Sequence, residues 1–297
     1  MRIAVTGSTG LIGTALVTSL HAGGHDVVRL VRRPARAADE VSWDPEAETI
    51  DVAGLAGVEG AVHLAGAGVG DRRWTDGYKR KLLDSRVNGT RALATALGSL
   101  DPLPRVLVCG SAVGYYGDRD EQALTEDATP GTGFLADTVR AWEAATEPAE
   151  EAGIRVSHAR TGLVLSRQGG ALAKLLPLLK FGLGGRIGNG RQWWPWITLD
   201  DEVRALEFLL EKELPGAVNL GSPQPRRQLD VIQALGAVFH RPTLFPAPAF
   251  GVRLVLGEFA GDVLSSQRML PARLLDAGFG FHHQTVEQGA AWVARSD

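Results

Sequence analysis

The chain has 297 residues, of which 44% are apolar and 22% charged, a composition typical of a globular protein with a large core. Its formal net charge of −3 predicts no general attraction to nucleic acid or to an anionic membrane. The single cysteine, Cys109, excludes an internal disulfide and a cysteine metal cluster. No apolar run approaches the roughly 18 to 20 residues that span a bilayer, and Met1 is followed at once by a predicted strand. We therefore expect a cytoplasmic protein that acts on a small-molecule substrate, with neither nucleic acid nor a membrane as partner.

Short apolar runs alternate with helical patterns along the first half of the chain. Strands are expected at 2–6, 26–31, 60–64, 105–109 and 155–159, and helical patterns lie near 78–100 and 134–152. This alternation is typical of a parallel sheet with helices on both faces. The predicted fold class is therefore α/β, a Rossmann-type doubly wound parallel sheet whose ligands bind at the carboxyl ends of the strands.

The pattern changes after about Thr161. A glycine-rich run at 182–190 breaks the periodicity, and tryptophans and prolines follow it. We expect residues 1–161, with returning segments at about 197–222, to form a dinucleotide-binding domain. Residues 162–196 and 223–297 are then predicted to form a smaller substrate-side lobe with the C-terminal region.

The first predicted strand leads directly into three glycines with the spacing G-x-x-G-x-x-G, followed by a helical pattern. A diphosphate needs a tight turn, a backbone that it can approach closely, and a helix N-terminus with free N–H groups. Glycine supplies the turn and the close approach. The pattern predicts a dinucleotide site along the residues Gly7, Thr9, Gly10, Leu11, Ile12 and Gly13.

Arg32 and Arg33 follow the second predicted strand directly. At this place an acidic residue would bind the ribose of NAD, whereas an arginine accommodates the 2′-phosphate of NADP. Because guanidinium groups suit phosphate, NADP(H) is favoured over NAD(H). The alternative is a solvated pair of surface arginines.

The third predicted strand ends in small residues, against which a cofactor can lie. They are Leu64, Ala65 and Gly66, after His63, which we expect to be a structural residue of the strand end. Arg86, on the next helix, either meets a cofactor phosphate or pairs with a neighbour such as Asp84.

Together with the glycine loop and this strand end, the segment 109–117 (CGSAVGYYG) resembles the extended short-chain dehydrogenase/reductase superfamily. More narrowly, the chain is similar to an atypical epimerase-like branch of NADP-dependent oxidoreductases. The motifs of that branch are Ser85-Arg86, Gly182–Gly185 with Gly190–Gln192, Trp196–Asp201 and the C-terminal segment 267–279. The resemblance covers nearly the whole chain and implies a Rossmann fold and a nicotinamide cofactor.

The superfamily transfers hydride with a Ser or Thr, a Tyr that moves the substrate proton, and a Lys four residues after that Tyr. Here Phe134 and Thr138 stand where the Tyr and the Lys are expected. The chain has three tyrosines, at 78, 115 and 116, and no lysine between Lys81 and Lys174, so the pair is absent and not displaced. The resemblance assigns the serine role to Ser111, and Tyr115 is our candidate for the proton donor, with water or Ser111 alone as alternatives.

At another strand end, Leu163 is expected to meet the nicotinamide carboxamide, and Arg160 to bind an anion or to brace the loop. The tryptophans at 193–196 pack within the lobe or roof the active-site cleft. Asp200-Asp201 is expected to cap a helix. No metal site is expected, because His282-His283 has no acidic partner at ligand spacing.

Two functions follow from these observations. The first is an NADP(H)-dependent oxidoreductase, or an epimerase-like enzyme, acting on a small carbonyl or sugar-like substrate. The second is an NADP(H)-binding scaffold or redox sensor without turnover, which the missing Tyr and Lys motivate.

Overall fold

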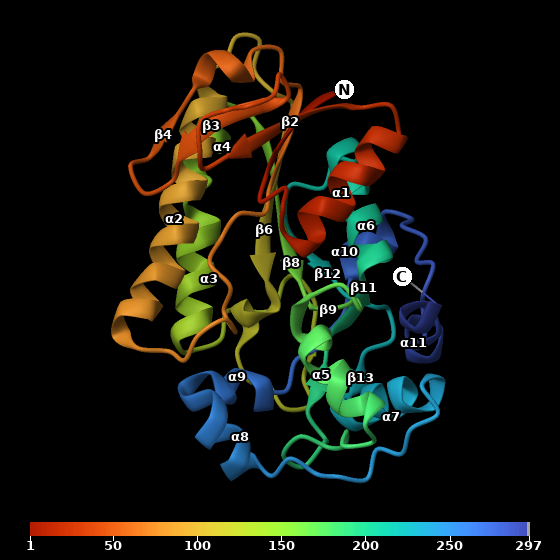
Figure 1. Cartoon of the computed structure of the whole chain (residues 1–297). Helices are drawn as coiled ribbons and strands as arrows, with labels where there is room; N and C mark the ends of the chain where they lie inside the picture. Colours follow the sequence, from red (N-terminus) through yellow and green to blue (C-terminus); the bar gives the residue numbers. More distant parts are fainter. Residues whose placement is uncertain (296–297) are drawn as a thin grey trace.

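A central sheet of eight strands, in the order β12-β8-β6-β5-β1-β2-β3-β4, dominates the computed structural model, which describes residues 1–295. All neighbouring strands run parallel except β3 and β4, which form an antiparallel pair at one edge (Figure 1). The strands are β1 (Arg2–Thr6), β2 (Asp26–Val31), β3 (Glu40–Asp44), β4 (Thr49–Ile50), β5 (Gly60–His63), β6 (Val106–Ala112), β8 (Arg155–Thr161) and β12 (Gly216–Leu220).

Helices cover both faces of this sheet, as the βα alternation predicts (Figure 1). Two pack together on one face: α1 (Leu11–Ala22) and α6 (Leu199–Glu211). Three pack together on the other: α2 (Asp76–Gly98), α3 (Phe134–Ala144) and α4 (Glu147–Glu151). The strands between them are nearly continuous apolar runs because a parallel sheet is buried on both faces; β6, for example, is buried from Val106 to Ser111.

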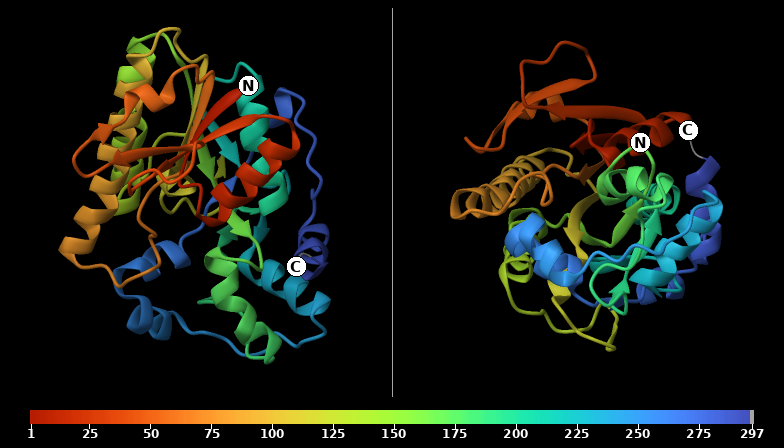
Figure 2. Two further views of the ribbon diagram at one scale, coloured as in Figure 1. Left: turned by 45° about the horizontal axis from the view of Figure 1, so that its top comes forward. Right: turned by 60° about the horizontal axis from the view of Figure 1, so that its bottom comes forward.

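The remaining elements form a smaller lobe below the carboxyl ends of the strands and the segments that tie it to the sheet (Figures 1 and 2). Here α5, α7 and α11 enclose a second apolar core around Trp196. The elements of the lobe and of these connecting segments are β7 (Ala123–Leu124), β9 (Leu163–Leu165), α5 (Gly170–Lys180), β10 (Trp193–Trp194), β11 (Trp196–Thr198), β13 (Arg226–Arg227), α7 (Gln228–Val238), α8 (Ala249–Leu256), α9 (Ala260–Leu264), β14 (Arg268–Met269), α10 (Ala272–Asp276) and α11 (Val286–Arg295), with 3₁₀ turns η2 (Val113–Tyr116) and η3 (Gly257–Phe259). The 3₁₀ turn η1 (Val52–Leu55) belongs instead to the sheet, where it packs beside β3.

The structure departs from the sequence-based expectations at two places. The edge strands β3 and β4 were not expected, although Val41 and Trp43 alternate with polar residues and are buried. The helical pattern expected at 134–152 is two helices, because a break after Ala144 precedes Pro148 in the first turn of α4. None of the helices in residues 1–295 combines the length and the apolar character that crossing a bilayer requires.

Candidate cofactor and active site

The glycine loop between β1 and α1 is wound so tightly that side chains are excluded from it. Gly7 has a φ of +66°, and the N–H of Gly10 donates back to its carbonyl at 2.9 Å. A Cβ on Gly13 would lie 2.8 Å from the carbonyl carbon of Gly7 and closer still to its oxygen. The loop therefore leaves the first N–H groups of α1 open to an anion, which fits the diphosphate of a dinucleotide.

The end of β5 is held directly against this loop. A Cβ on Gly7 would lie 2.8 Å from the carbonyl of Leu64. The hydroxyl of Thr6 accepts hydrogen bonds from the N–H groups of Leu64 (3.1 Å) and Ala65 (3.2 Å) and lies 2.8 Å from Nδ1 of His63. With both lone pairs in use, the Thr6 hydroxyl donates to His63, which places the imidazole proton on Nε2. The segment 64–66 is thus fixed beside the glycine loop.

His63 is fully buried, and this burial lowers its pKa to about 4, with a further contribution from Arg86. The imidazole is therefore neutral near pH 7. Its edge contacts Trp43, with the ring centroids 6.1 Å apart. The expectation that His63 is a structural residue agrees with this position.

Arg86 lies beneath the same strand end. It donates to the carbonyls of Ala67 (3.0 Å) and Leu82 (3.1 Å), and its guanidinium stacks over Trp142 at 5.0 Å. Burial lowers the pKa of Arg86 to about 10, so the group is still charged near pH 7. A Cβ on Gly66 would lie 3.4 Å from the Arg86 side chain. Arg86 thus braces the segment against which the cofactor is predicted to lie.

The two arginines after β2 have different surroundings. Arg33 forms a bidentate pair with Glu40, with both N–O distances 2.7 Å, and Arg29 binds Asp39 at 2.7 Å. The hydrogen bonds from Arg33 lower the pKa of Glu40 to about 2. The pairing of β3 with β2, which the sequence does not predict, brings these acids to the strand end. Asp39 and Glu40 are consequently neutralised by protein cations.

Arg32 is exposed, as Arg33 is, but makes no ion pair within residues 1–295. It lines an open pocket of about 390 Å³ together with the residues Trp43, Asp44, Pro45 and Glu46. Arg32 and Arg33 therefore differ, although the sequence predicts the same role for both. Arg33 is paired with Glu40, and Arg32 is available to a ligand.

Ser111 at the end of β6 takes part in a buried polar network. Its hydroxyl donates to Oε1 of Glu143 on α3 at 2.6 Å. The same carboxylate receives two hydrogen bonds of 2.8 Å from Arg160 at the end of β8. Burial alone would raise the pKa of Glu143, but the hydrogen bonds from Arg160 and Ser111 hold it below its usual value. These contacts engage both Ser111 and Arg160 inside the protein, and for Arg160 this is the bracing role, one of the two alternatives that the sequence left open.

Two tyrosines extend this network. The guanidinium of Arg160 lies 3.4 Å above the ring of Tyr115 and donates to the hydroxyl of Tyr116 at 3.1 Å. Tyr116 is fully buried and donates in turn to Asn219 at 2.7 Å. Tyr115 is only half-buried, and its hydroxyl has no hydrogen-bond partner in the part of the chain described.

An aromatic cluster occupies the place where the superfamily carries its Tyr. Phe134 opens α3, and its ring lies 5.1 Å from that of Trp74, which lies 5.3 Å from Phe259. Four residues on, Thr138 is buried. Phe134 therefore packs against the ring of Trp74, and its side chain has no group that could donate a proton.

Other predicted contacts are already used inside the protein. The N–H of Leu163 donates to the carbonyl of Pro195 at 2.6 Å, so this group is not free for a carboxamide. Trp196 is fully buried in the second core. Trp193 donates to Glu121 at 2.9 Å and lies under Arg227. These tryptophans pack within the lobe, the first of the two alternatives that the sequence left open.

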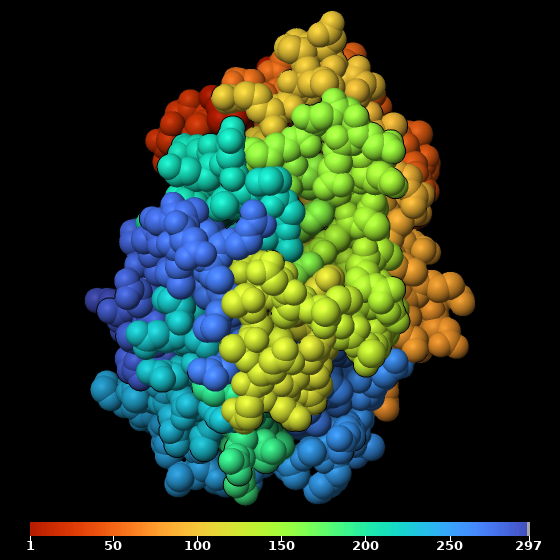
Figure 3. Space-filling view, turned by 180° about the vertical axis from the view of Figure 1, so that it is seen from behind, coloured from red at the N-terminus to blue at the C-terminus, as the bar shows by residue number. Residues whose placement is uncertain are grey.

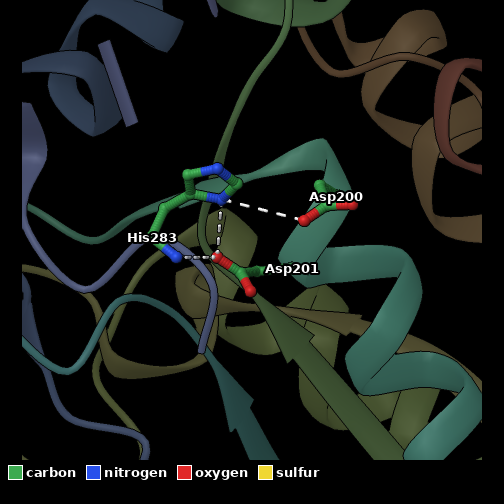
Figure 4. A group of neighbouring side chains, drawn as sticks. All are labelled: Asp200, Asp201 and His283. Atoms are coloured by element: carbon green, nitrogen blue, oxygen red, sulfur yellow. Dashed lines mark hydrogen bonds and ion pairs between the residues drawn. The ribbon is translucent and has the colours of Figure 1, made fainter. Parts of the chain in front are cut away.

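Two acids at the start of α6 hold the C-terminal segment (Figure 4). Asp201 accepts hydrogen bonds from the backbone N–H groups of His282 (2.7 Å) and His283 (2.9 Å), and from Arg204 at 3.1 Å. Nδ1 of His283 lies 3.1 Å from Asp201 and 3.8 Å from Asp200. The sequence did not show this pairing because about eighty residues separate the partners. Since Asp201 is surrounded by protein donors, the cluster acts as an anchor.

Comparisons with known proteins add to this geometry. Residues 3–221 match the sequence model of the NAD dependent epimerase/dehydratase family, and residues 247–293 match a domain of unknown function, DUF1731. The epimerase family protein ML0860 of Mycobacterium leprae is 43% identical over 293 residues, covering 98% of this chain and 95% of the relative. The chloroplastic SDR39U1 homolog of Arabidopsis thaliana is 34% identical over 97% of this chain and 85% of its own length.

A solved structure resembles the whole chain. The human epimerase family protein SDR39U1 (isoform 2), crystallised with NADPH, superimposes with a TM-score of 0.92 at 32% identity and covers 99% of both chains. The likeness therefore extends over the sheet and the lobe together.

Proposed function

Because the chain belongs to the NAD dependent epimerase/dehydratase family, we propose that it binds NADP(H) in preference to NAD(H) and acts as an oxidoreductase, or as an epimerase-like enzyme, on a small carbonyl or sugar-like substrate. The nucleotide-binding fold supports the first part of this proposal. The second part rests on the chemistry of the family, which a nicotinamide cofactor supplies by accepting or donating hydride. The residues of this chain determine where the cofactor binds and how a proton reaches the substrate.

The glycine loop and the N-terminus of α1 would hold the diphosphate, through the backbone from Gly7 to Gly13. The segment Leu64–Gly66, fixed by Thr6 and braced by Arg86, would lie against the nucleoside. Neither Arg160 nor the N–H of Leu163 belongs to this set, because both are engaged inside the protein.

The preference for NADP(H) is carried by Arg32. It follows β2, where the cofactor ribose is expected, and it has no ion-pair partner within residues 1–295. Of the carboxylates near this place, Asp39 and Glu40 are paired with arginines. Asp44 accepts hydrogen bonds from the backbone N–H groups of Glu46 and Ala47. NADPH in the human relative agrees with this preference, although that cofactor was bound to another protein.

For the proton we propose Tyr115. Phe134 and Thr138 carry no suitable group, and the hydroxyl of Ser111 is directed to Glu143. Tyr115 lies in the turn η2 after β6, its hydroxyl has no hydrogen-bond partner within residues 1–295, and the guanidinium of Arg160 lies over its ring.

The first test is a fluorescence titration of Arg32→Ala with NADPH and NADH. Removing one charge-assisted phosphate contact, worth about 1.5–3 kcal/mol, is expected to weaken NADPH binding roughly 10- to 100-fold. NADH binding should be unchanged, because NADH has no 2′-phosphate. Arg105→Ala is the matched control: it removes an exposed arginine at the start of β6, at the opposite end of the strands, and should leave the NADPH-to-NADH ratio as it was. Equal affinity of the wild-type protein for both cofactors would refute the assignment of Arg32.

The second test follows NADPH absorbance while carbonyl compounds are screened. Turnover is expected for at least one compound, and Tyr115→Phe should reduce kcat about 100-fold or more, the usual contribution of a positioned acid. Tyr116→Phe serves as the control, since it removes a hydroxyl that is buried and bonded to Asn219 and leaves the hydroxyl of Tyr115 in place. Tight NADPH binding with no turnover across a broad panel would instead favour the alternative function, a scaffold or redox sensor.

A further inference from the structure

Exposed apolar side chains gather at one end of the molecule. Eight of the eleven large apolar residues exposed in the described chain lie in two short segments, 178–183 and 244–255. They are Leu178, Phe181, Leu183, Leu244, Phe245, Phe250, Leu254 and Val255. Helix α8 has no buried residue at all, and Phe250 on it is 74% exposed. Such a concentration marks a surface that contacts something apolar.

The two segments form one continuous surface. The N–H of Phe245 donates to the carbonyl of Gly184 at 3.3 Å, and the N–H of Ala247 donates to that of Arg186 at 2.8 Å. Ile187 and Ala247 form a β-bridge. Figures 1 and 2 place α5, α8 and the chain between α7 and α8 at the same end, opposite the N-terminus. We call residues 174–191 and 240–256 the α5–α8 surface; Figure 3 shows its green and blue segments forming the lower end together.

Every formally charged residue in this surface is basic. The six are Lys174, Lys180, Arg186, Arg191, Arg241 and Arg253, and all are exposed. No Asp or Glu occurs in either segment. The acids at the rim face lysines: Asp71 lies 4.0 Å from Lys174, and Glu258 lies 3.0 Å from Lys79. The formal charge of −3, from which no membrane attraction was expected, averages over the whole chain and conceals this local excess.

We propose that the α5–α8 surface docks on the surface of an anionic phospholipid bilayer. The aromatic and aliphatic side chains of α8 and of the adjacent loop would enter the headgroup region, with the lysines and arginines against lipid phosphates. The protein would lie on the bilayer without spanning it. A second copy of the chain fits this surface poorly, because a two-fold contact would bring the six cations of one copy against those of the other.

The test is co-sedimentation of the full chain with vesicles of phosphatidylcholine alone and of phosphatidylcholine mixed with phosphatidylglycerol. Binding is expected to the mixed vesicles. It should weaken as salt is raised, because the attraction between exposed charges is largely screened beyond about 8 Å at physiological ionic strength and at shorter distances in higher salt. The double variant Phe250→Ser/Leu254→Ser should bind at least tenfold more weakly. Lys180→Glu/Arg253→Glu should lose the preference for the anionic vesicles.

Controls come from exposed residues elsewhere on the molecule. Leu103→Ser/Leu275→Ser removes side chains of 44% and 47% exposure outside the surface, and Arg105→Glu reverses a distant charge; both should bind as the wild type does. Failure of the wild-type protein to bind the mixed vesicles would overturn the proposal, and so would equal binding by the Phe250/Leu254 variant. A dimer in solution that the same variant dissociates would assign the surface to a second copy. Thermal unfolding of each variant shows whether it is folded.

Discussion

Gly13→Ala is expected to abolish measurable NADPH binding while leaving the rest of the sheet folded. The new Cβ would lie 2.8 Å from the carbonyl carbon of Gly7 and 3.0 Å from the Cα of Ser8. All of these neighbours are backbone atoms, so the loop has to move away from α1. Because the loop and the helix N-terminus together form the diphosphate site, we expect a loss of at least about 100-fold in affinity, the size of two lost hydrogen bonds to a charged group.

The matched control is Gly77→Ala. Gly77 lies in the first turn of α2, and a Cβ there would have only the Thr75 hydroxyl at 4.0 Å. Alanine is a better helix former than glycine by about 1 kcal/mol, so this variant should be slightly more stable and bind NADPH normally. Isothermal titration and thermal unfolding separate the two effects. Unchanged affinity in Gly13→Ala would show that the loop does not hold the cofactor.

The sequence predicts the sheet well because each parallel strand is a local signal. Short apolar runs flanked by glycine or charged residues identified β1, β2, β5, β6 and β8 without knowledge of their partners. The edge pair β3 and β4 is not evident from the sequence because the apolar residues of β3, Val41 and Trp43, alternate with polar ones, and β4 has only two residues. The missing edge also hid Glu40, whose position beside Arg33 depends on the pairing of β3 with β2.

The same difference between local and distant signals applies to the site. The glycine loop is a contiguous motif whose geometry follows from residue type, so its conformation could be predicted. The partner of Ser111 could not, because Glu143 lies on α3, 32 residues away, and the contact depends on how that helix packs against the sheet. For the same reason the sequence left two roles open for Arg160, binding an anion or bracing the loop, and only the contacts of its guanidinium with Glu143 and Tyr116 distinguish them. Motifs locate a site, but pairings across elements decide which of its side chains are free.

Glu143→Ala is expected to lower the free energy of unfolding by about 3–5 kcal/mol, the usual effect of removing one partner from a buried ion pair. Arg160 is 4% exposed and would keep its charge without a counterion, while Ser111 would lose its acceptor. Chemical denaturation near pH 7 measures the loss. The double variant Glu143→Leu/Arg160→Met should be more stable than Glu143→Ala, because it leaves no uncompensated charge in the interior.

The pH dependence gives an independent check. Because Arg160 and Ser111 hold the pKa of Glu143 below its ordinary value of 4.5, the carboxylate stabilises the fold fully above about pH 4.5. That contribution is lost as the pH falls through the lowered pKa. The difference in stability between the wild-type protein and Glu143→Ala should therefore shrink in acid and stay constant from pH 6 to pH 8. A difference in the free energy of unfolding below about 1 kcal/mol at pH 7 would contradict this account. It would mean that water hydrates the guanidinium of Arg160 once Glu143 is removed, so that the pair contributes no more than an ion pair on a protein surface.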